Sequence, residues 1–329
     1  MKPVVAITIG DFNGVGPEVA LKAAGNASVR AMCQPLLVGP LNVFDHVMQS
    51  LRIKTKIAKT SLTIMPAAAV PVWDVGDGIW ADVQWGKPTK ASGKSAGVAI
   101  EHAVDLCLRK KAHAMVTAPI SKEALNLAGY NFPGQTEMVT LLSRSQKVAM
   151  MLVSDKMRVG LVTTHVPVRS VTENISKEKI IDKVLVIHDA LVRNFGVKSP
   201  SIAVLALNPH AGDKGVIGSE DQELVVPSIA HLQSKNLNVD GPFPADAFFG
   251  KQLYKKYDAV VAMYHDQGLI PLKLISFGKA VNFSAGLNII RTSPDHGTAY
   301  DIAGKNKASI SSIVEAIRLA VQFCKRTHD

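Results

Sequence analysis

The chain has few cysteines and no long apolar run, and each shortage excludes a class of protein. Its cysteines, Cys33, Cys107 and Cys324, are odd in number and far apart in the sequence, which argues against a disulfide framework and, without any C-x-x-C pair, against a thiolate zinc site. No uncharged apolar run reaches the ~20 residues of a membrane helix. The apolar run that follows Lys2 leaves no room for a signal region. We therefore expect a soluble, cytoplasmic protein.

Aromatic residues are also scarce, which bears on the strongly positive charge. The formal net charge is +10, but aromatics make up only 5% of the residues and the lysines and arginines are scattered. A nucleic-acid surface would need a basic stripe with stacking side chains in it. We expect neither nucleic acid nor membrane as a partner. An anionic small substrate explains part of the charge, and a solvated surface explains the rest.

Apolar, strand-like runs alternate with helix-like segments along nearly the whole chain. With 47% apolar and 19% charged residues in 329 positions, this composition is typical of a globular protein with room for two domains. The alternation favours an α/β fold with a largely parallel sheet. We expect strands near residues 4–9, 34–39, 113–117, 157–164, 202–209 and 257–264, and helices near 19–24, 42–51, 92–110 and 309–324, with short strands and loops over 53–95.

The first turn contains several glycines but lacks the usual dinucleotide-binding pattern. Gly10, Gly14 and Gly16 do not have the G-x-G-x-x-G spacing, and Val29-Arg30 stands where an acidic ribose partner would be sought. A standard Rossmann site is therefore not expected. Pro17 and Glu18 instead suit the first turn of a helix.

Three strand-like runs end in a histidine, at His165, His210 and His265, and the polar cluster from His265 to Gly268 predicts a turn after the third run. In open α/β sheets, ligands bind at the carboxyl ends of the strands. Three imidazoles meeting there would suit a catalytic metal with open coordination positions. The alternative is that each is an ordinary hydrogen-bonded surface residue, and spacing alone does not decide between the two.

Other polar residues have two possible roles each. Ser121 is a candidate helix N-cap, either as an ordinary cap or with an anion held by the free N–H groups behind it. Lys273, Asn282 and Arg291 stand among apolar or small neighbours, where a lysine and an arginine would suit a phosphate or carboxylate. Ordinary surface charges would give the same pattern.

Seven motifs, in order along the chain, carry a resemblance to a known family. They are Gly10-Asp11 with 14–18, 117–122, 132–137, 207–212, 241–246, 264–268 and 295–299. Together they resemble 4-hydroxythreonine-4-phosphate dehydrogenase, an enzyme family of pyridoxal phosphate biosynthesis, over about residues 4 to 304. The loop 295–304 also resembles the adenosine-binding loop of isopropylmalate and isocitrate dehydrogenases, which bind NAD without a Rossmann fingerprint.

The resemblance implies two α/β/α domains with a central cleft, of the isocitrate/isopropylmalate dehydrogenase type. We expect the first domain at 1–127 plus 280–329 and the second at 128–279, with a homodimer whose active site lies at the subunit interface. His165 and His210 of one chain would share one divalent ion (zinc, magnesium, cobalt or manganese) with His265 of the other. The substrate residues implied are Gln135, Thr136, Lys273, Asn282 and Arg291, and those implied for NAD or NADP are His296, Gly297, Thr298, Ala299 and Asp301.

The implied reaction is the NAD(P)-dependent oxidation of 4-phosphooxy-L-threonine to a β-keto acid that loses carbon dioxide. Lys273 is a catalytic candidate, and Asp246 or Asp266 is a candidate proton acceptor or orienting group for a metal-bound histidine. The chain departs from the family pattern at Phe12-Asn13, at Tyr300 and at Gln135, where the family commonly has histidine. Glutamine can hydrogen-bond a substrate but cannot take up a proton near neutral pH.

Three rival functions stay open at this point. The first is oxidation of a phosphorylated four-carbon sugar acid, threonate or erythronate 4-phosphate, with the same metal and cofactor. The second is a metal-dependent hydrolase, because three histidines and a water also suit hydrolysis. The third is a protein that binds a metal or an anion without catalysis. The sequence alone does not distinguish NAD from NADP, nor one first-row metal from another.

Overall fold

The computed structural model describes residues 2–61, 68–76 and 82–326, and these pack into two compact units. Unit 1 is Met1–Ser145 with Leu287–Asp329, and unit 2 is Gln146–Gly286. We expected domain boundaries after residues 127 and 279, and these boundaries stay predictions.

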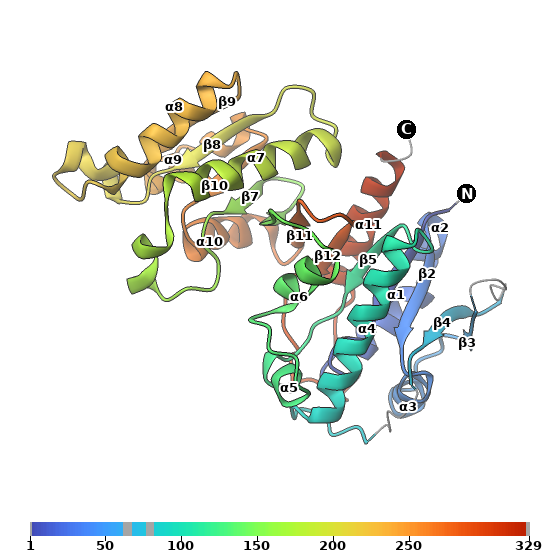
Figure 1. The fold of residues 1–329 in the computed structure, drawn as a ribbon. Coiled ribbons are helices and arrows are strands. Elements are labelled where there is room, and N and C mark those ends of the chain that lie inside the picture. The colour runs from blue at the N-terminus through green and yellow to red at the C-terminus, as the bar shows by residue number, and fades with distance from the viewer. Residues whose placement is uncertain (1, 62–67, 77–81, 327–329) are drawn as a thin grey trace. The chain divides into compact units, whose positions relative to one another are not determined.

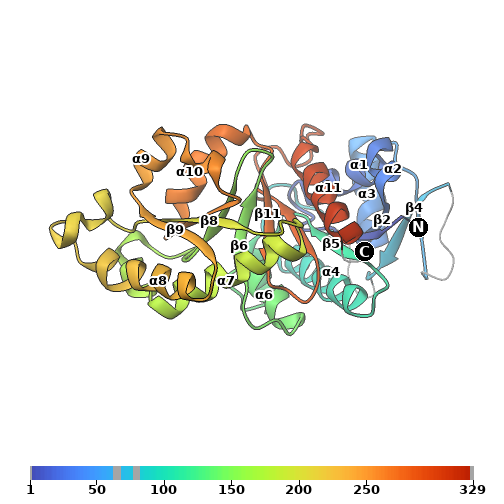
Figure 2. The ribbon, with the colours of Figure 1, turned by 90° about the horizontal axis from the view of Figure 1, so that it is seen from above.

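Unit 1 is a parallel sheet with helices on both faces. Its strands are β1 (Val4–Thr8), β2 (Gln34–Gly39), β3 (Ile57–Lys59), β4 (Val70–Asp74), β5 (Ala114–Thr117) and β12 (Arg291–Pro294), in the order β3-β4-β2-β1-β5-β12, and all neighbouring pairs among them are parallel. Its helices are α1 (Gly16–Gly25), α2 (Ala27–Met32), α3 (Leu41–Leu51), α4 (Lys90–Leu108), α5 (Lys122–Leu127), α6 (Gln135–Leu142) and α11 (Ser311–Arg326). Figure 2 shows α1 and α11 on one face and α4 on the other.

The strand order of unit 1 reverses direction between β1 and β5. From β1 the chain proceeds outward through β2 and β4, then crosses over by α4 to β5 on the other side of β1 (Figure 1). Such a switch point leaves a crevice at the carboxyl ends of the two strands, where ligands of doubly wound folds bind. The turn Gly10–Asp11 after β1 and the turn Ala118–Pro119 after β5 therefore occupy the position expected for a site.

Helix α4 has a sequence that fixes both its start and its buried face. Thr89 and Ser92 form a reciprocal capping box, so the helix begins at Lys90, slightly earlier than we expected. Its apolar face is buried, as predicted, at Ala96, Ala99, Ile100, Ala103 and Val104. Glycine at position 93 lets α5 approach, because a Cβ there would lie 1.8 Å from the carbonyl oxygen of Ala124.

Unit 2 is a mixed sheet, again between two helical layers. Its strands are β6 (Ala149–Val153), β7 (Arg158–Leu161), β8 (Ser201–Leu205), β9 (Asn238–Phe243), β10 (Ala259–Ala262) and β11 (Val281–Ala285), in the order β11-β6-β7-β10-β8-β9. Its helices are α7 (Lys177–Arg193), α8 (Val226–Ser234), α9 (Ala245–Gly250) and α10 (His265–Ser276). β6 runs antiparallel to both β11 and β7, whereas β7, β10, β8 and β9 are parallel.

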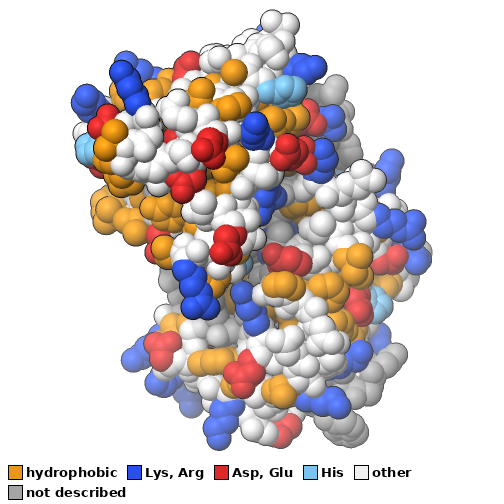
Figure 3. All heavy atoms as spheres, turned by 60° about the vertical axis from the view of Figure 1, so that its left-hand side comes forward, with side chains coloured by type: hydrophobic (Ala, Val, Ile, Leu, Met, Phe, Trp, Pro, Cys, Tyr) orange, Lys and Arg blue, Asp and Glu red, His pale blue; other side chains and the backbone are white. Residues whose placement is uncertain are grey.

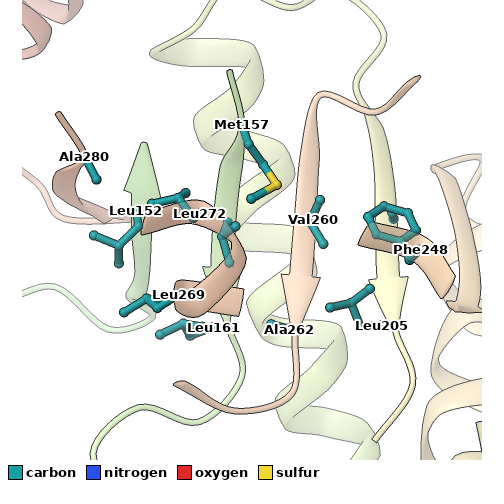
Figure 4. Packing of buried hydrophobic residues seen from close by; sticks show 12 residues of the cluster. Leu152, Met157, Leu161, Leu205, Phe248, Val260, Ala262, Leu269, Leu272 and Ala280 are labelled. Atoms are coloured by element: carbon teal, nitrogen blue, oxygen red, sulfur yellow. The ribbon is translucent and has the colours of Figure 1, made fainter. Parts of the chain in front are cut away.

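The core of unit 2 holds α9 and α10 against the parallel strands. Leu269 and Leu272 of α10 are buried with Leu152 and Leu161 of the sheet, and Phe248 of α9 belongs to the same cluster (Figure 4). Burying a leucine or phenylalanine side chain stabilises a fold by about 1.5–3 kcal/mol. This packing fixes α10 on the sheet. The helix already begins at His265, where the sequence predicted a turn.

The α/β/α class expected from the sequence is confirmed in each unit. The cysteines Cys33, Cys107 and Cys324 are buried and form no disulfide, in agreement with the sequence-based expectation. Among the helices of the described ranges, none combines the length and the apolar character that crossing a membrane requires. On the face seen in Figure 3, acidic and basic side chains are interspersed and form no basic stripe.

Candidate functional site

The three predicted histidines follow neighbouring parallel strands of unit 2. His165 comes after β7, His265 begins α10 directly after β10, and His210 lies in the 3-10 segment Pro209–Gly215 after β8. Because β7, β10 and β8 are adjacent and parallel, their carboxyl ends share one edge of the sheet. The ring centroids of His165 and His265 are 5.9 Å apart. The fold therefore brings two of the three imidazoles together and puts the third at the same edge.

These imidazoles fit a metal ion in their chemistry. Two nitrogens that each bind zinc at about 2.1 Å lie no more than ~4.2 Å apart, which rings with the observed separation can reach by rotating. Nδ1 of His265 is 2.7 Å from Oδ1 of Asp266, and such a carboxylate contact fixes the ring and leaves Nε2 for an ion. Over the part of the chain that the structure describes, no group of three histidine, cysteine, aspartate or glutamate side chains meets the geometry of a metal site. The three-histidine site stays a prediction.

The loop that carries His210 has an unusual backbone. The five residues from His210 to Lys214 all have positive φ angles, between 42° and 75°. For residues other than glycine this left-handed region costs roughly 1–2 kcal/mol each. Among these five residues, position 212 requires glycine, because a Cβ there would lie 2.7 Å from the carbonyl oxygen of Gly218. Surrounding contacts must hold this loop in place.

The other predicted residues of unit 2 lie on three elements. Lys273 is on α10, two turns after His265, and is exposed. Asp246 is in the first turn of α9 and is also exposed. Asn282 is on β11, and its Oδ1 is buried without a hydrogen-bond partner among the described residues. A ligand with a hydroxyl or ammonium group would satisfy this acceptor.

In unit 1, three predicted substrate residues come together around Arg291. This arginine begins β12, and its side chain is 1% exposed. Its Nε and Nη2 donate to Oγ1 of Thr117 at 3.0 and 2.7 Å, and its Nη1 donates to Oγ1 of Thr136 at 3.4 Å. Gln135 precedes Thr136 in the first turn of α6, and its Oε1 is buried with no hydrogen-bond partner in the described part of the chain.

Burial lowers the pKa of the Arg291 guanidinium to about 10, while the charge of Glu137 raises it. At this value the group is still a cation near neutral pH. The two threonine hydroxyls fix its plane but bring no charge. Such an arrangement suits recognition of a phosphate or carboxylate, for which arginine has a matching fork of donors.

The predicted nucleotide loop, residues 295–304, lies against the first turn of unit 1. The backbone N–H of Val15 donates to the carbonyl of Thr298 at 2.9 Å, and the hydroxyl of Tyr300 donates to Oδ2 of Asp11 at 2.7 Å. A Cβ at Gly14 would lie 2.7 Å from the carbonyl oxygen of Thr298. The loop is therefore fixed at the switch point, while His296, Gly297 and Asp301 are exposed and Ala299 is half-buried.

Sequence reasoning missed two residues that organise unit 1. Asp11 is fully buried; burial raises the pKa of its carboxyl, and hydrogen bonds from Tyr300, Asn13, Ser92 and Gly14 lower that pKa in part. Thr117, the last residue of β5, holds Arg291. Their positions in the sequence could have identified both, because each is a polar residue at the carboxyl end of a strand beside the switch point.

Comparisons with known proteins agree over nearly the whole chain. The sequence model of the family described as "Pyridoxal phosphate biosynthetic protein PdxA" matches residues 31–320. The chain is 42% identical, over 328 residues and 98% of each sequence, to the 4-hydroxythreonine-4-phosphate dehydrogenase of Trichlorobacter lovleyi. It is 39% identical, again over 98% of each, to the D-threonate 4-phosphate dehydrogenase of Cupriavidus necator. The crystal structure of the 4-hydroxythreonine-4-phosphate dehydrogenase from Klebsiella pneumoniae has a TM-score of 0.88, 35% identity and 98% coverage of each chain.

Proposed function

The chain belongs to the PdxA family of pyridoxal phosphate biosynthetic proteins, and we propose that it is an NAD(P)-dependent dehydrogenase of 4-phosphooxy-L-threonine. Oxidation at C3 would move the proton of the C3 hydroxyl to a base and would remove the hydrogen on C3 as hydride, for which a bound nicotinamide would supply the acceptor. The product, 2-amino-3-oxo-4-phosphooxybutanoate, then breaks its bond to the carboxylate, and the electron pair stays on C2. Release of carbon dioxide and protonation of C2 give 3-amino-2-oxopropyl phosphate.

The observation that carries this proposal is the buried Arg291 with its hydrogen bond to Thr136. The hydroxyls of Thr117 and Thr136 fix this guanidinium, and the charge of Glu137 favours its charged form, so Arg291 is a positioned cation for the substrate phosphate. The unpartnered Oε1 of Gln135 lies one residue before Thr136 and accepts a hydrogen bond from the substrate in this proposal. Lys273 and Asn282 bind the same substrate, Lys273 through its charge and Asn282 through its unpartnered Oδ1.

His165 and His210 of one chain, with His265 of the other, would hold one divalent ion, which would supply Lewis acidity for the oxidation. A donor set of imidazoles suits zinc or cobalt better than magnesium. Asp266 orients the His265 ring through the 2.7 Å contact with Nδ1. Asp246 is the remaining candidate for the base that takes the hydroxyl proton.

NAD or NADP binds in this proposal at the loop that contains His296, Gly297, Thr298, Ala299 and Asp301. The observation in favour is that this loop is fixed on the turn after β1, at the switch point of a doubly wound sheet. The residues of this loop would hold and orient the cofactor, which would supply the hydride acceptor.

A homodimer is part of the proposal because unit 2 exposes large apolar side chains. On α10, Ile270 and Leu274 are 56% and 68% exposed and lie one turn apart, and Phe277, which caps the end of the helix, is 81% exposed. Val168 and Val216 are 84% and 81% exposed. A second copy that covers these side chains would remove them from water. We place the enzyme in the cytoplasm.

A second candidate is oxidation of threonate or erythronate 4-phosphate, favoured by the likeness to the Cupriavidus necator enzyme. The two substrates differ at C2, where one has an amine and the other a hydroxyl. The test is steady-state kinetics with both, with zinc or cobalt and with each nicotinamide cofactor. A higher kcat/KM for the sugar acid would replace the first assignment with the second.

The same assay separates the remaining rivals. Turnover without formation of reduced nicotinamide would indicate a hydrolase. Loss of turnover in a folded His210→Ala variant would exclude a protein that binds the metal without catalysis. If that variant kept full activity, the metal assignment would be wrong.

A further inference from the structure

We propose that a basic hollow on unit 1, which we call the α1/α3 hollow, binds a small anion that bears phosphate groups. The hollow has a volume of about 360 Å³, which falls within the ~300–1,000 Å³ of small-molecule pockets. The proposal does not depend on the proposed function, because none of the lining residues takes part in it. The lining comes from three separate parts of the sequence: Lys22, Gly25, Asn26, Arg52, Ile53, Lys54, Thr55 and Asn306.

The α1/α3 hollow carries positive charge that the chain does not neutralise. Three of its lining residues are cations, and none is a carboxylate. Lys22 is paired, because its Nζ lies 2.6 Å from Oε1 of the fully buried Glu18. Arg52 and Lys54 are exposed, and within the described ranges neither side chain has a hydrogen-bond or ion-pair partner. Two positive charges are therefore available to a ligand.

The backbone that carries these two cations is anchored on both sides. Arg52 is the C-cap of α3 and has a left-handed backbone, with a φ of 53°. The hydroxyl of Thr55 donates to the carbonyl of Leu21 in α1 at 3.1 Å. A Cβ at Gly25 would lie 2.3 Å from this hydroxyl oxygen, so glycine there leaves room for it. Lys54 thus lies between two anchored residues, and a segment fixed in advance loses less freedom when a ligand binds.

The ends of two helices offer a different reason for the cations. Helix α1 ends at Gly25 and helix α3 at Leu51, and the carboxyl end of a helix attracts positive charge. Neutral donors already serve these ends, since Thr55 donates to the carbonyl of Leu21 and Asn306 to that of Leu51, each at 3.1 Å. The two roles predict different results. A role at the helix ends predicts a lower Tm without the cations, and a ligand site predicts a lower affinity for an anion.

A phosphate group suits the donors of the α1/α3 hollow. Arginine offers a planar fork of donors that matches phosphate oxygens, and lysine adds a point charge. Oδ1 of Asn26 already accepts from the N–H and the hydroxyl of Ser28, at 2.9 and 2.7 Å. Asn26 therefore offers a ligand its amide donors and not its acceptor. Two cations and neutral donors, without a carboxylate in the lining, favour an anion with more than one negative charge.

The decisive variant is Arg52→Gln/Lys54→Gln, which removes both charges and keeps polar side chains at both positions. The measurement is isothermal titration calorimetry of the full chain with inorganic pyrophosphate, without divalent ions and at constant ionic strength, together with the Tm of each protein. Because hydrogen bonds to charged groups are among the stronger ones, we expect the affinity of the hollow for pyrophosphate to fall roughly 10- to 100-fold.

Arg291 gives pyrophosphate a second place to bind, so the titration is repeated with Arg291→Gln. We expect this variant to bind one pyrophosphate per chain, and its combination with Arg52→Gln/Lys54→Gln to bind none. Absence of binding in a folded Arg291→Gln variant would overturn the proposal. If Arg291→Gln does not fold, the number of pyrophosphate molecules bound per chain decides, because Arg52→Gln/Lys54→Gln alone should lower it by one relative to the wild type.

Arg144→Gln/Lys110→Gln is the matched control, because it removes the same two kinds of charge from unit 1. Arg144 and Lys110 are exposed and, like Arg52, have a left-handed backbone, with φ angles of 54° and 56°. Neither residue lines the hollow, so the control should bind pyrophosphate as the wild type does. Equal losses of affinity in the two double variants would mean that only net charge matters and would overturn the proposal. A lower Tm with unchanged affinity in Arg52→Gln/Lys54→Gln would assign these cations to the helix ends instead.

Discussion

Removal of the Tyr300 hydroxyl should loosen the predicted nucleotide loop and destabilise unit 1. The phenol donates to Oδ2 of Asp11 at 2.7 Å, and Asp11 is fully buried. Tyr300→Phe takes away this donor and keeps the ring. Because Tyr300 belongs to the loop and Asp11 to the turn after β1, this hydrogen bond joins the two segments, together with the one from Val15 N–H to the carbonyl of Thr298.

The size of the effect follows from the charge and burial of the acceptor. A hydrogen bond to a charged group contributes about 1.5–3 kcal/mol, and a buried acceptor left without it also loses its compensation for desolvation. We expect the free energy of unfolding to fall by this amount, which corresponds to a decrease in Tm of about 3–12 °C for a unit of this size.

The effect has a defined pH dependence. Burial raises the pKa of the Asp11 carboxyl above its ordinary value of 3.8, and the Tyr300 hydrogen bond opposes this rise. An acid with a raised pKa contributes stability that is present below its unfolded pKa and lost as pH rises through the folded pKa. In Tyr300→Phe, the pKa of Asp11 in the folded state is therefore higher than in the wild type. The loss in free energy of unfolding relative to the wild type is largest at neutral pH and shrinks as pH falls toward 3.8.

Tryptophan fluorescence during urea unfolding measures the effect in the right unit, since all three tryptophans fall within the sequence range of unit 1. Tyr257→Phe is the matched control, followed by circular dichroism because it lies in unit 2: its hydroxyl also donates to an aspartate, Oδ2 of Asp240 at 3.0 Å, but this hydrogen bond is exposed. It should change stability by less than about 1 kcal/mol. Equal deficits in the two variants, or a deficit in Tyr300→Phe that does not depend on pH, would refute the reasoning.

Two further substitutions test the substrate pocket and the packing. Arg291→Lys removes the guanidinium fork that binds Thr117 and Thr136. The kcat/KM for the phosphorylated substrate should therefore fall roughly 10- to 100-fold. An equal fall with the substrate that lacks the phosphate would contradict this role. Gly93→Ala in α4 should destabilise the protein, although alanine usually stabilises helices, because its Cβ would meet the Ala124 carbonyl at 1.8 Å. Gly250→Ala is the control, because a Cβ there meets open space. The Tm from thermal unfolding should fall in Gly93→Ala and not in Gly250→Ala.

The sequence predicted those parts of the fold whose cause is local. The strand at 34–39 and the apolar face of α4 follow from runs and spacings that a few neighbouring residues determine. The approach of His165 to His265 was also within reach of the sequence, since both follow apolar runs that form adjacent parallel strands. Local pattern and strand direction were enough for these features.

The sequence could not predict contacts whose partners are distant along the chain. Nothing near Asp221 indicates that its carboxylate holds the loop of His210, and nothing near Asp11 indicates Tyr300 as its donor. The helical start at His265 was missed because His265-Asp266-Gln267-Gly268 has the composition of a turn, whereas packing of Leu269 and Leu272 on the sheet stabilises a helix. Packing decided against local composition there.

The order in which the chain leaves the ribosome has a consequence for unit 1. Residues 146–286 form unit 2 without interruption, but unit 1 needs β12 and α11 from residues beyond 286. Until β12 is synthesised, the side of β5 opposite β1 has no strand to pair with. Nascent chains and products of premature stop codons before Arg291 therefore expose an unpaired parallel edge, which is a template for aggregation. Unit 1 begins first in the sequence but is the later of the two to be complete.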